Sequence, residues 1–199
     1  MEKIPEQEPA NLIKIVLFGP ESTGKTTLSK LLARQYNTVW VREFARNYLQ
    51  NKWNNERKTC EHEDLVPIAI GQMNLENDLS KKADKVLICD TDLLETKVYS
   101  EEYYGGFVDP ELDNAALKNQ YDLYLLTYID TPWEEDDLRD RPEQRQEMFD
   151  AFESALIKHN RPFILLKGTV KNRLDKATLA IDKLLVNSKT LDTFSLKNE

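Results

Sequence analysis

Short apolar runs alternate with amphipathic stretches along most of this 199-residue chain. The apolar runs lie at residues 12–18, 38–42, 85–89, 122–127 and 162–166, and their length is typical of β-strands. Between them, apolar residues recur at helical spacing, which predicts helices at 26–36, 43–50, 65–82, 93–104, 142–159 and 171–186. Strands that alternate with helices in this way pair in parallel, so we predict an α/β fold, a five-stranded parallel sheet flanked by helices.

The pattern is absent at both ends of the chain and in one internal stretch. Residues 1–11 form a polar N-terminal extension, and residues 188–199 form a polar C-terminal tail that is expected to fray. Residues 51–64 are polar and predict a loop, in which Glu63 or Asp64 is available to cap the next helix. Because no linker or repeat interrupts the remainder, residues 12–187 are expected to form one domain.

A glycine-containing stretch, FGPESTGKTT, joins the first predicted strand to the first predicted helix. It matches the pattern G-x-x-x-x-G-K-[ST], in which glycines let backbone N–H groups turn inward to phosphate oxygens. Lys25, expected to be solvated, would reach the β- and γ-phosphates, and the Thr26 hydroxyl would ligate Mg²⁺. A surface turn of small residues is the alternative, but the strand, loop and helix in sequence favour a P-loop NTPase fold. The residues expected to bind ATP are Gly19, Glu21, Ser22, Thr23, Gly24, Lys25, Thr26, Thr27 and Arg145.

Two carboxylates follow predicted strands, and parallel sheets bind ligands at the carboxyl ends of their strands. Asp90 ends the run at 85–89, where P-loop proteins hold Mg²⁺, so we predict a metal role for it; capping the next helix is the alternative. Glu43 would accept the proton of an attacking hydroxyl or orient that hydroxyl. An equally supported alternative is that Glu43 is an acid favoured by the dipole of the following helix, or that it pairs with Arg46.

Three arginines lie within the stretch DDLRDRPEQR, which has no apolar face. In a P-loop protein this composition favours a mobile arginine-rich lid, at about residues 130–146, that closes over the triphosphate. Arg139 and Arg141 are predicted to stabilise the transferring phosphoryl group, together with Arg145. The alternative is the exposed, charged start of a helix.

Composition narrows the functional classes. The net charge of −8 argues against general nucleic-acid binding, which requires a basic face. The sequence has no run of 18 apolar residues and no signal-peptide pattern, so neither a membrane span nor a leader is expected. Cys60 and Cys89 lack metal-ligand spacing, and a buried Cys89 thiol in a cytoplasmic protein is expected. We expect no role for His62 or His159, and the sequence indicates no oligomeric state.

Several segments together resemble one family: GPESTGKTTL, REFARNYL, GQMNLEND, ICDTDLLETKVYSEEYYG, YDLYLLTYIDTPWEEDDLRDRPEQR and PFILLKG. Over residues 13–185 the chain is similar to the ribosylnicotinamide kinase domain of the bacterial NadR-type NAD-biosynthesis proteins. The resemblance implies phosphorylation of the 5′-hydroxyl of nicotinamide riboside by MgATP, giving nicotinamide mononucleotide. Those proteins carry a nucleotidyltransferase domain, and some a DNA-binding one, before this domain. Because the phosphate loop here begins at Gly19, we expect neither, and no adenylylation of the mononucleotide.

A nucleoside substrate requires groups for its ribose and for its base. A flat pyridinium ring favours aromatic faces, for which Tyr103, Tyr104 and Trp133 are suitably placed, whereas Arg42 would repel such a ring. The residues expected to bind the substrate are Glu43, Arg46, Asp92, Tyr103 and Trp133.

Two other functions remain open from the sequence. A kinase for another nucleoside or a nucleoside monophosphate would share the loop, the acids and the lid. A nucleotide-binding switch without kinase activity is the second, although the N-K-x-D stretch of guanine-specific switches is absent.

Overall fold

A parallel sheet forms the centre of the protein, as the alternation of apolar runs predicts. The computed structural model describes residues 3–139 and 141–195, with side chains described as far as residue 187. Its five strands lie in the order β2-β3-β1-β4-β5, and every neighbouring pair is parallel. The predicted fold class is therefore confirmed. The strands are β1 (Ile13–Phe18), β2 (Trp40–Val41), β3 (Val86–Asp90), β4 (Leu123–Thr127) and β5 (Phe163–Leu166).

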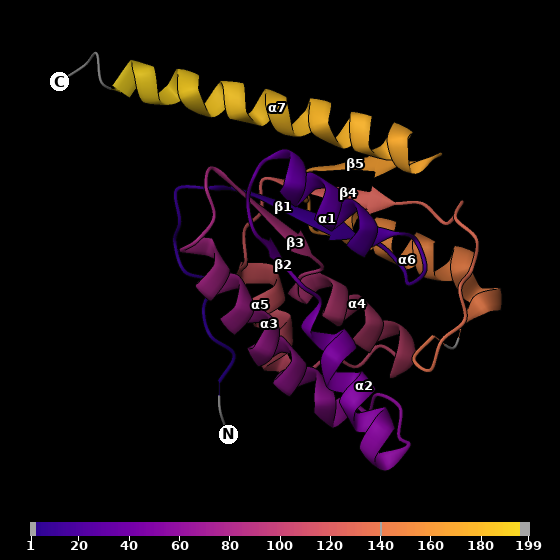
Figure 1. Cartoon of the computed structure of the whole chain (residues 1–199). Coiled ribbons are helices and arrows are strands. Elements are labelled where there is room, and N and C mark those ends of the chain that lie inside the picture. Colours follow the sequence, from indigo (N-terminus) through magenta and orange to yellow (C-terminus); the bar gives the residue numbers. More distant parts are fainter. Residues whose placement is uncertain (1–2, 140, 196–199) are drawn as a thin grey trace.

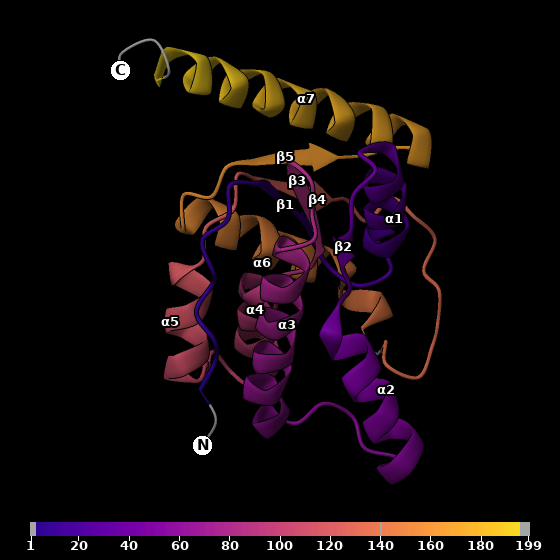
Figure 2. The same ribbon diagram turned by 60° about the vertical axis from the view of Figure 1, so that its left-hand side comes forward.

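Helices cover both faces of this sheet (Figures 1 and 2). They are α1 (Lys25–Gln35), α2 (Phe44–Glu56), α3 (Leu65–Ser80), α4 (Leu93–Tyr103), α5 (Pro110–Lys118), α6 (Arg145–Lys158) and α7 (Val170–Ser195), with short 3₁₀ turns at His62–Asp64 and Pro142–Gln144. On one face α1 and α7 pack, and on the other lie α3 to α6, while α2 projects from the lower edge in both views. Among the described residues, no helix is long and apolar enough to cross a membrane.

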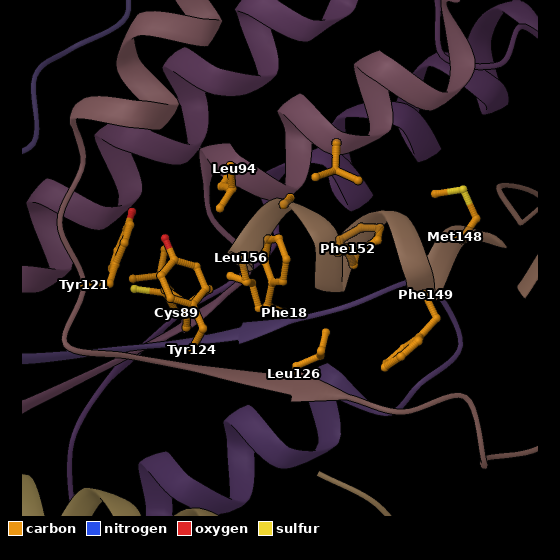
Figure 3. Close-up of a cluster of buried hydrophobic side chains, with 14 of the residues drawn as sticks. Phe18, Cys89, Leu94, Tyr121, Tyr124, Leu126, Met148, Phe149, Phe152 and Leu156 are labelled. Atoms are coloured by element: carbon orange, nitrogen blue, oxygen red, sulfur yellow. The ribbon is translucent and has the colours of Figure 1, made fainter. Parts of the chain in front are cut away.

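The apolar runs are continuous because both sides of each central strand are buried. Along β1, Ile15 and Leu17 pack against α1 and α7, whereas Val16 and Phe18 face α4 and α6. Figure 3 shows the second of these clusters, in which the Phe18 ring meets Tyr124 and Phe152 at centroid distances of 5.4 and 4.9 Å. The Cys89 thiol lies in the same cluster and is buried, as predicted.

Helix α2 is longer than predicted, because tertiary contacts rather than an apolar period support its second half. The segment 51–56, predicted as loop, continues the helix, and no residue of α2 is buried. Asp64 accepts hydrogen bonds from Lys52 (2.5 Å) and Tyr48 (3.1 Å), which lie on α2. The prediction that Glu63 or Asp64 caps α3 is wrong: Asp64 instead accepts from the Glu61 N–H, closing the short 3₁₀ turn.

Two further helical segments differ from the prediction. Helix α5 was not predicted, although its signals are in the sequence: Asp109 caps it by accepting from the Glu111 N–H at 2.8 Å, and Pro110 follows at its first position. Helix α7 continues to Ser195, nine residues beyond its predicted end at residue 186, so most of the expected C-terminal tail is helical. Residues 196–199 of that tail lie outside the described residues.

The N-terminal extension packs against the domain between α3 and α5 (Figure 2). Gln7 donates to Glu76, and the Glu8 N–H donates to Asn77, at 2.7 and 2.9 Å. Ile4 is buried in an apolar cluster with residues of α3, α4 and α5. From residue 4 onward this polar segment is therefore an ordered layer of the domain; residues 1 and 2 lie outside the described part.

Candidate active site

The glycine stretch forms a tight loop between β1 and α1, in which both glycines have positive φ angles. Gly19 has φ +135°, and a Cβ there would lie 2.8 Å from the Thr127 hydroxyl oxygen. Gly24 is left-handed at φ +85° and precedes α1 without a side-chain cap, which leaves the N–H groups of the helix N-terminus available to an anion. Thr26 and Thr27 are exposed on this first turn.

Thr23 shapes the loop from inside. Its hydroxyl donates to the Pro20 carbonyl and lies 2.7 Å from the Thr127 hydroxyl, and the side chain is buried. Only its backbone is therefore placed to bind phosphate.

The prediction that Lys25 is solvated is wrong. Lys25 is 8% exposed, and its ammonium contacts the carbonyl oxygens of Gly19 (2.5 Å) and Pro20 (3.0 Å) and a carboxylate oxygen of Glu95 (3.1 Å). Burial lowers the pKa of Lys25, but the nearby carboxylates of Glu95, Glu43 and Asp90 raise it above its usual value, so the side chain stays charged.

Asp90 is buried at the end of β3 with an oxygen that lacks a protein partner. It is 1% exposed, and its Oδ1 accepts no hydrogen bond from the described residues. Burial and the charge of Glu43 raise its pKa to about 6, while Thr26 and Lys25 act in the opposite direction. A buried carboxylate oxygen beside the Thr26 hydroxyl suits a hard cation. No group of three or more His, Cys, Asp or Glu among the described residues could hold a metal alone, so a Mg²⁺ ion here would need phosphate or water ligands.

Asp92 is a capping residue. One of its oxygens accepts from the Glu95 N–H (3.1 Å) and the other from the Tyr124 hydroxyl (2.8 Å), and the residue is 1% exposed. The predicted contact between Asp92 and the ribose therefore does not fit this structure. Because Asp92 caps α4, Asp90 is not needed for that cap, and its predicted metal role stays a prediction.

Glu43 stands directly before α2, and helix α3 fixes its position. The Phe44 N–H donates to the Gln72 side chain at 2.8 Å, and the Phe44 ring fills the space where a Cβ on Gly71 would stand, 2.2 Å away. The Glu43 side chain makes no capping hydrogen bond. Its charge acts on both Lys25 and Asp90, so it lies at the phosphate loop; Arg46 pairs with Asp136 instead.

The predicted lid is an extended segment that runs from β4 toward α2 along the side of the molecule (Figure 2). Arg46 on α2 binds both oxygens of Asp136, at 3.2 and 2.7 Å. At the other contact, Ser22 of the phosphate loop accepts from the Glu134 N–H and the Thr131 hydroxyl, at 2.9 and 2.7 Å. The segment therefore bridges the phosphate loop and α2. Its predicted mobility stays a prediction, and residue 140 lies outside the described residues.

Two of the three lid arginines lie on aromatic rings. Arg141 stacks 3.6 Å from the centroid of Tyr103, and Arg145 lies 5.7 Å from that of Trp133. Arg139 instead pairs with Asp136 at 3.1 Å, within the segment itself. The expected exposed helix start is present only from the 3₁₀ turn at Pro142–Gln144 onward.

A pocket beside the phosphate loop brings together two of the five predicted substrate residues, Tyr103 and Trp133, and two of the three lid arginines, Arg141 and Arg145. It is lined by Pro20, Glu21, Tyr99, Tyr103, Trp133, Arg141, Arg145 and Met148. Tyr104 is absent from it, because its hydroxyl donates to the Cys60 carbonyl at 3.0 Å on another side of α4. Sequence reasoning missed Tyr99 and Glu95, although they lie four and eight residues before Tyr103, on one face of the same helix.

A parallel sheet with this strand order, a glycine loop after its first strand and acids at neighbouring strand ends define a P-loop nucleotide-binding protein. The family model for the AAA domain matches residues 14–173, and the chain belongs to that family.

Among curated proteins, the chain is similar to the trifunctional NAD biosynthesis/regulator protein NadR of Salmonella typhimurium and of Escherichia coli. Each is 32% identical over 142 residues, which cover 69% of this chain and 34% of the relative. The chain thus spans about a third of the length of these relatives. The predicted resemblance to NadR-type proteins is confirmed.

Solved structures share the fold. A NadR protein in complex with NR has a TM-score of 0.73 at 22% identity, covering 87% of this chain and 51% of that one. A deoxyadenosine kinase from M. mycoides has a TM-score of 0.66 at 14% identity, covering 86% and 100% of the two chains. A thymidylate kinase from Candida albicans has a TM-score of 0.65 at 16% identity, covering 88% and 93%.

Proposed function

We propose that this chain is a phosphotransferase of the nucleoside kinase type, and that it phosphorylates the 5′-hydroxyl of nicotinamide riboside with ATP. The observation that carries the proposal is the cluster of arginines and aromatic rings beside the phosphate loop, where Arg141 lies on Tyr103 and leaves a cavity of only about 10 Å³. The 32% identity to proteins named for NAD biosynthesis supports the choice of acceptor. So does the shared fold with a NadR protein in complex with NR.

The phosphate loop would bind the triphosphate through the backbone from Gly19 to Thr26 and through Lys25. Arg141 and Arg145 border the same space and would stabilise charge on the transferring group. Thr26 and Asp90 would hold Mg²⁺, which supplies charge neutralisation between the β- and γ-phosphates.

Glu43 would orient the acceptor hydroxyl or take its proton. Its side chain is half-buried, makes no capping bond and acts electrostatically on Lys25, so it lies near the phosphate loop and is not committed to the helix end. A carboxylate at hydrogen-bonding distance from an attacking hydroxyl is the usual device for this step.

The base would lie against Tyr103. The face of this ring already accommodates a cation, the Arg141 guanidinium at 3.6 Å, and Glu21 lines the same pocket. A cationic pyridinium would find the same attraction there once Arg141 moves to the phosphates.

One assay tests the acceptor. Nicotinamide riboside, nicotinic acid riboside, the common nucleosides and their monophosphates are each offered with MgATP, and specificity constants are compared. We expect nicotinamide riboside to rank first. Replacing Tyr103 by Leu should raise its KM about tenfold through lost stacking, whereas Tyr104→Leu, outside the pocket, should leave KM unchanged.

A nucleoside monophosphate is the second candidate acceptor. Arg141 on the pocket wall and Arg46 nearby would bind its phosphate, and the fold is shared with a thymidylate kinase. Preference for a monophosphate over every free nucleoside would overturn the nicotinamide riboside proposal. Nucleotide binding without transfer to any acceptor would favour a nucleotide-binding switch.

A further inference from the structure

The ammonium of Lys25 is fully occupied inside the protein. A lysine ammonium has three N–H donors, and three acceptors surround this one: the carbonyl oxygens of Gly19 and Pro20 and the Oε1 of Glu95. Two of these acceptors belong to the loop that would receive phosphate. Lys25 therefore cannot bind a phosphate oxygen until at least one of these contacts is broken.

Glu95 is the acceptor that comes from outside the loop, on the first turn of α4. The side chains of Glu95 and Lys25 are 4% and 9% exposed, so water weakens their attraction little. The second oxygen of Glu95, Oε2, is buried and has no hydrogen-bond partner among the described residues. A carboxylate so placed is not required to cap α4, because Asp92 does so.

We propose that Glu95 is a positioning residue that holds Lys25 in a resting position, away from incoming phosphates. Nucleotide binding exchanges the Lys25–Glu95 contact for a contact between Lys25 and phosphate. Because the Lys25–Glu95 ion pair must break first, the net free energy of nucleotide binding is smaller. Glu95 therefore weakens nucleotide binding and favours nucleotide release. The inference rests on the proposed function only in requiring that the loop binds nucleotide phosphates.

Glutamine at position 95 keeps the size of the side chain but cannot ionise. Burial raises the pKa of Glu95 and the charge of Lys25 lowers it, so the variants are compared at pH 9 as well as at pH 7. Affinity for ATP without metal is measured by calorimetry on the full chain, with folding checked by melting temperature. We expect Glu95→Gln to bind ATP at least about tenfold more tightly than the parent. Tenfold corresponds to the free energy of one charge-assisted hydrogen bond, the Lys25–Glu95 contact that ATP no longer has to break. Glu95→Asp, which withdraws the carboxylate by one methylene, should tighten binding less and serves if the first variant does not fold.

Loss of a negative charge near the triphosphate would tighten binding by itself, so the design needs a matched control. Glu43→Gln removes a charge that also acts on Lys25 but that makes no ion pair with it. Equal tightening in Glu43→Gln and Glu95→Gln would overturn the proposal.

A double-mutant cycle gives the second criterion. In a Lys25→Ala background, Glu95→Gln should no longer tighten ATP binding, because no lysine remains to be released. The same gain in both backgrounds would refute a resting contact. Failure of the proposed function looks different: nucleotide binds with this coupling, yet no acceptor in the panel is phosphorylated.

Discussion

At the scale of single residues, burial and chemical role oppose each other most clearly at Asp90. A carboxylate that is 1% exposed, with one oxygen lacking a hydrogen bond among the described residues, destabilises the fold that holds it. Such groups persist at functional sites, where a ligand supplies the missing partner.

We expect Asp90→Asn to stabilise the ligand-free protein at pH 8 and to have little effect at pH 4. Burial raises the folded-state pKa of Asp90 from 3.8 to about 6, so the folded protein holds this proton more tightly than the unfolded chain does. Ionised Asp90 is therefore unfavourable, and the destabilisation develops between about pH 4 and pH 6, up to about 3 kcal/mol. Asparagine does not ionise. Melting temperatures across this range test the expectation.

The same variant should lose Mg²⁺-dependent tightening of ATP binding, measured by calorimetry with and without the metal. Asp92→Asn is the control: Asp92 is also buried with a pKa of about 6, but it caps α4. Retained metal dependence in Asp90→Asn would remove Asp90 from the metal site.

At the scale of secondary-structure elements, contacts between α2 and α3 position Glu43, the carboxylate proposed to act on the acceptor hydroxyl. Because the Phe44 ring occupies the space beside Gly71, even a methyl group there must displace the ring and, with it, the start of α2. Glu43 is the residue that immediately precedes this helix.

Gly71→Ala should therefore lower kcat at least about tenfold while changing the KM for ATP little, since the phosphate loop is not touched. Steady-state kinetics with both substrates varied test this expectation. The control is Asn74→Ala, one turn further along α3 at an exposed position. A fall in kcat that melting experiments explain by partial unfolding would count against a positioning effect.

The lid segment is attached to α2 by an ion pair that is partly exposed. The side chains of Arg46 and Asp136 are 40% and 23% exposed, so the pair contributes little to global stability. The only other described hydrogen bond from this segment to α2 joins Gln50 and Asp137 at 3.2 Å, so the pair is a main attachment of the segment to that helix. Asp136→Asn should raise amide hydrogen exchange across residues 130–139 in the ligand-free protein and leave the melting temperature nearly unchanged.

An ATP analogue should lower exchange in the same residues, if the segment closes over nucleotide. Glu135→Gln, at an exposed neighbouring position, serves as the control and should exchange like the parent. Identical exchange in Asp136→Asn and the parent would mean that other contacts hold the segment.

At the scale of the whole molecule, the sequence predicted those features that depend on neighbouring residues in the chain. The strands could be predicted because burial on both sides requires apolar residues at consecutive positions. The phosphate loop could be predicted because its backbone geometry restricts the residue type at a few positions. Helix α2 was predicted too short because Lys52, in its second half, binds Asp64 and Glu61 rather than an apolar core. The burial of Lys25 was missed for a related reason: its partner Glu95 is 70 positions away in the sequence, which shows no pattern that joins them.

In the candidate site, too, some residues were predicted correctly from their type and others were not. Tyr103 and Trp133 were predicted for the base and the arginines for the phosphoryl group, and the structure brings both aromatic residues to one pocket with Arg141 and Arg145, but not with Arg139. Asp92 and Tyr104 have equally suitable types but are committed to a helix cap and to the Cys60 carbonyl. Residue type indicates what a side chain is able to do, whereas only tertiary structure decides which of its atoms are already occupied.

One buried side chain connects segments that are far apart in the chain. Arg173, 1% exposed, donates to the carbonyl oxygens of Thr23 in the phosphate loop, Tyr128 and Gly168, and pairs with Asp130 at the base of the lid. Thr23 and Arg173 are 150 residues apart. During synthesis the phosphate loop leaves the ribosome long before Arg173 does. Until then the loop lacks the hydrogen bond from Arg173 to the Thr23 carbonyl. We therefore expect competence to bind nucleotide to arise late in synthesis, once the start of α7 has docked against the loop.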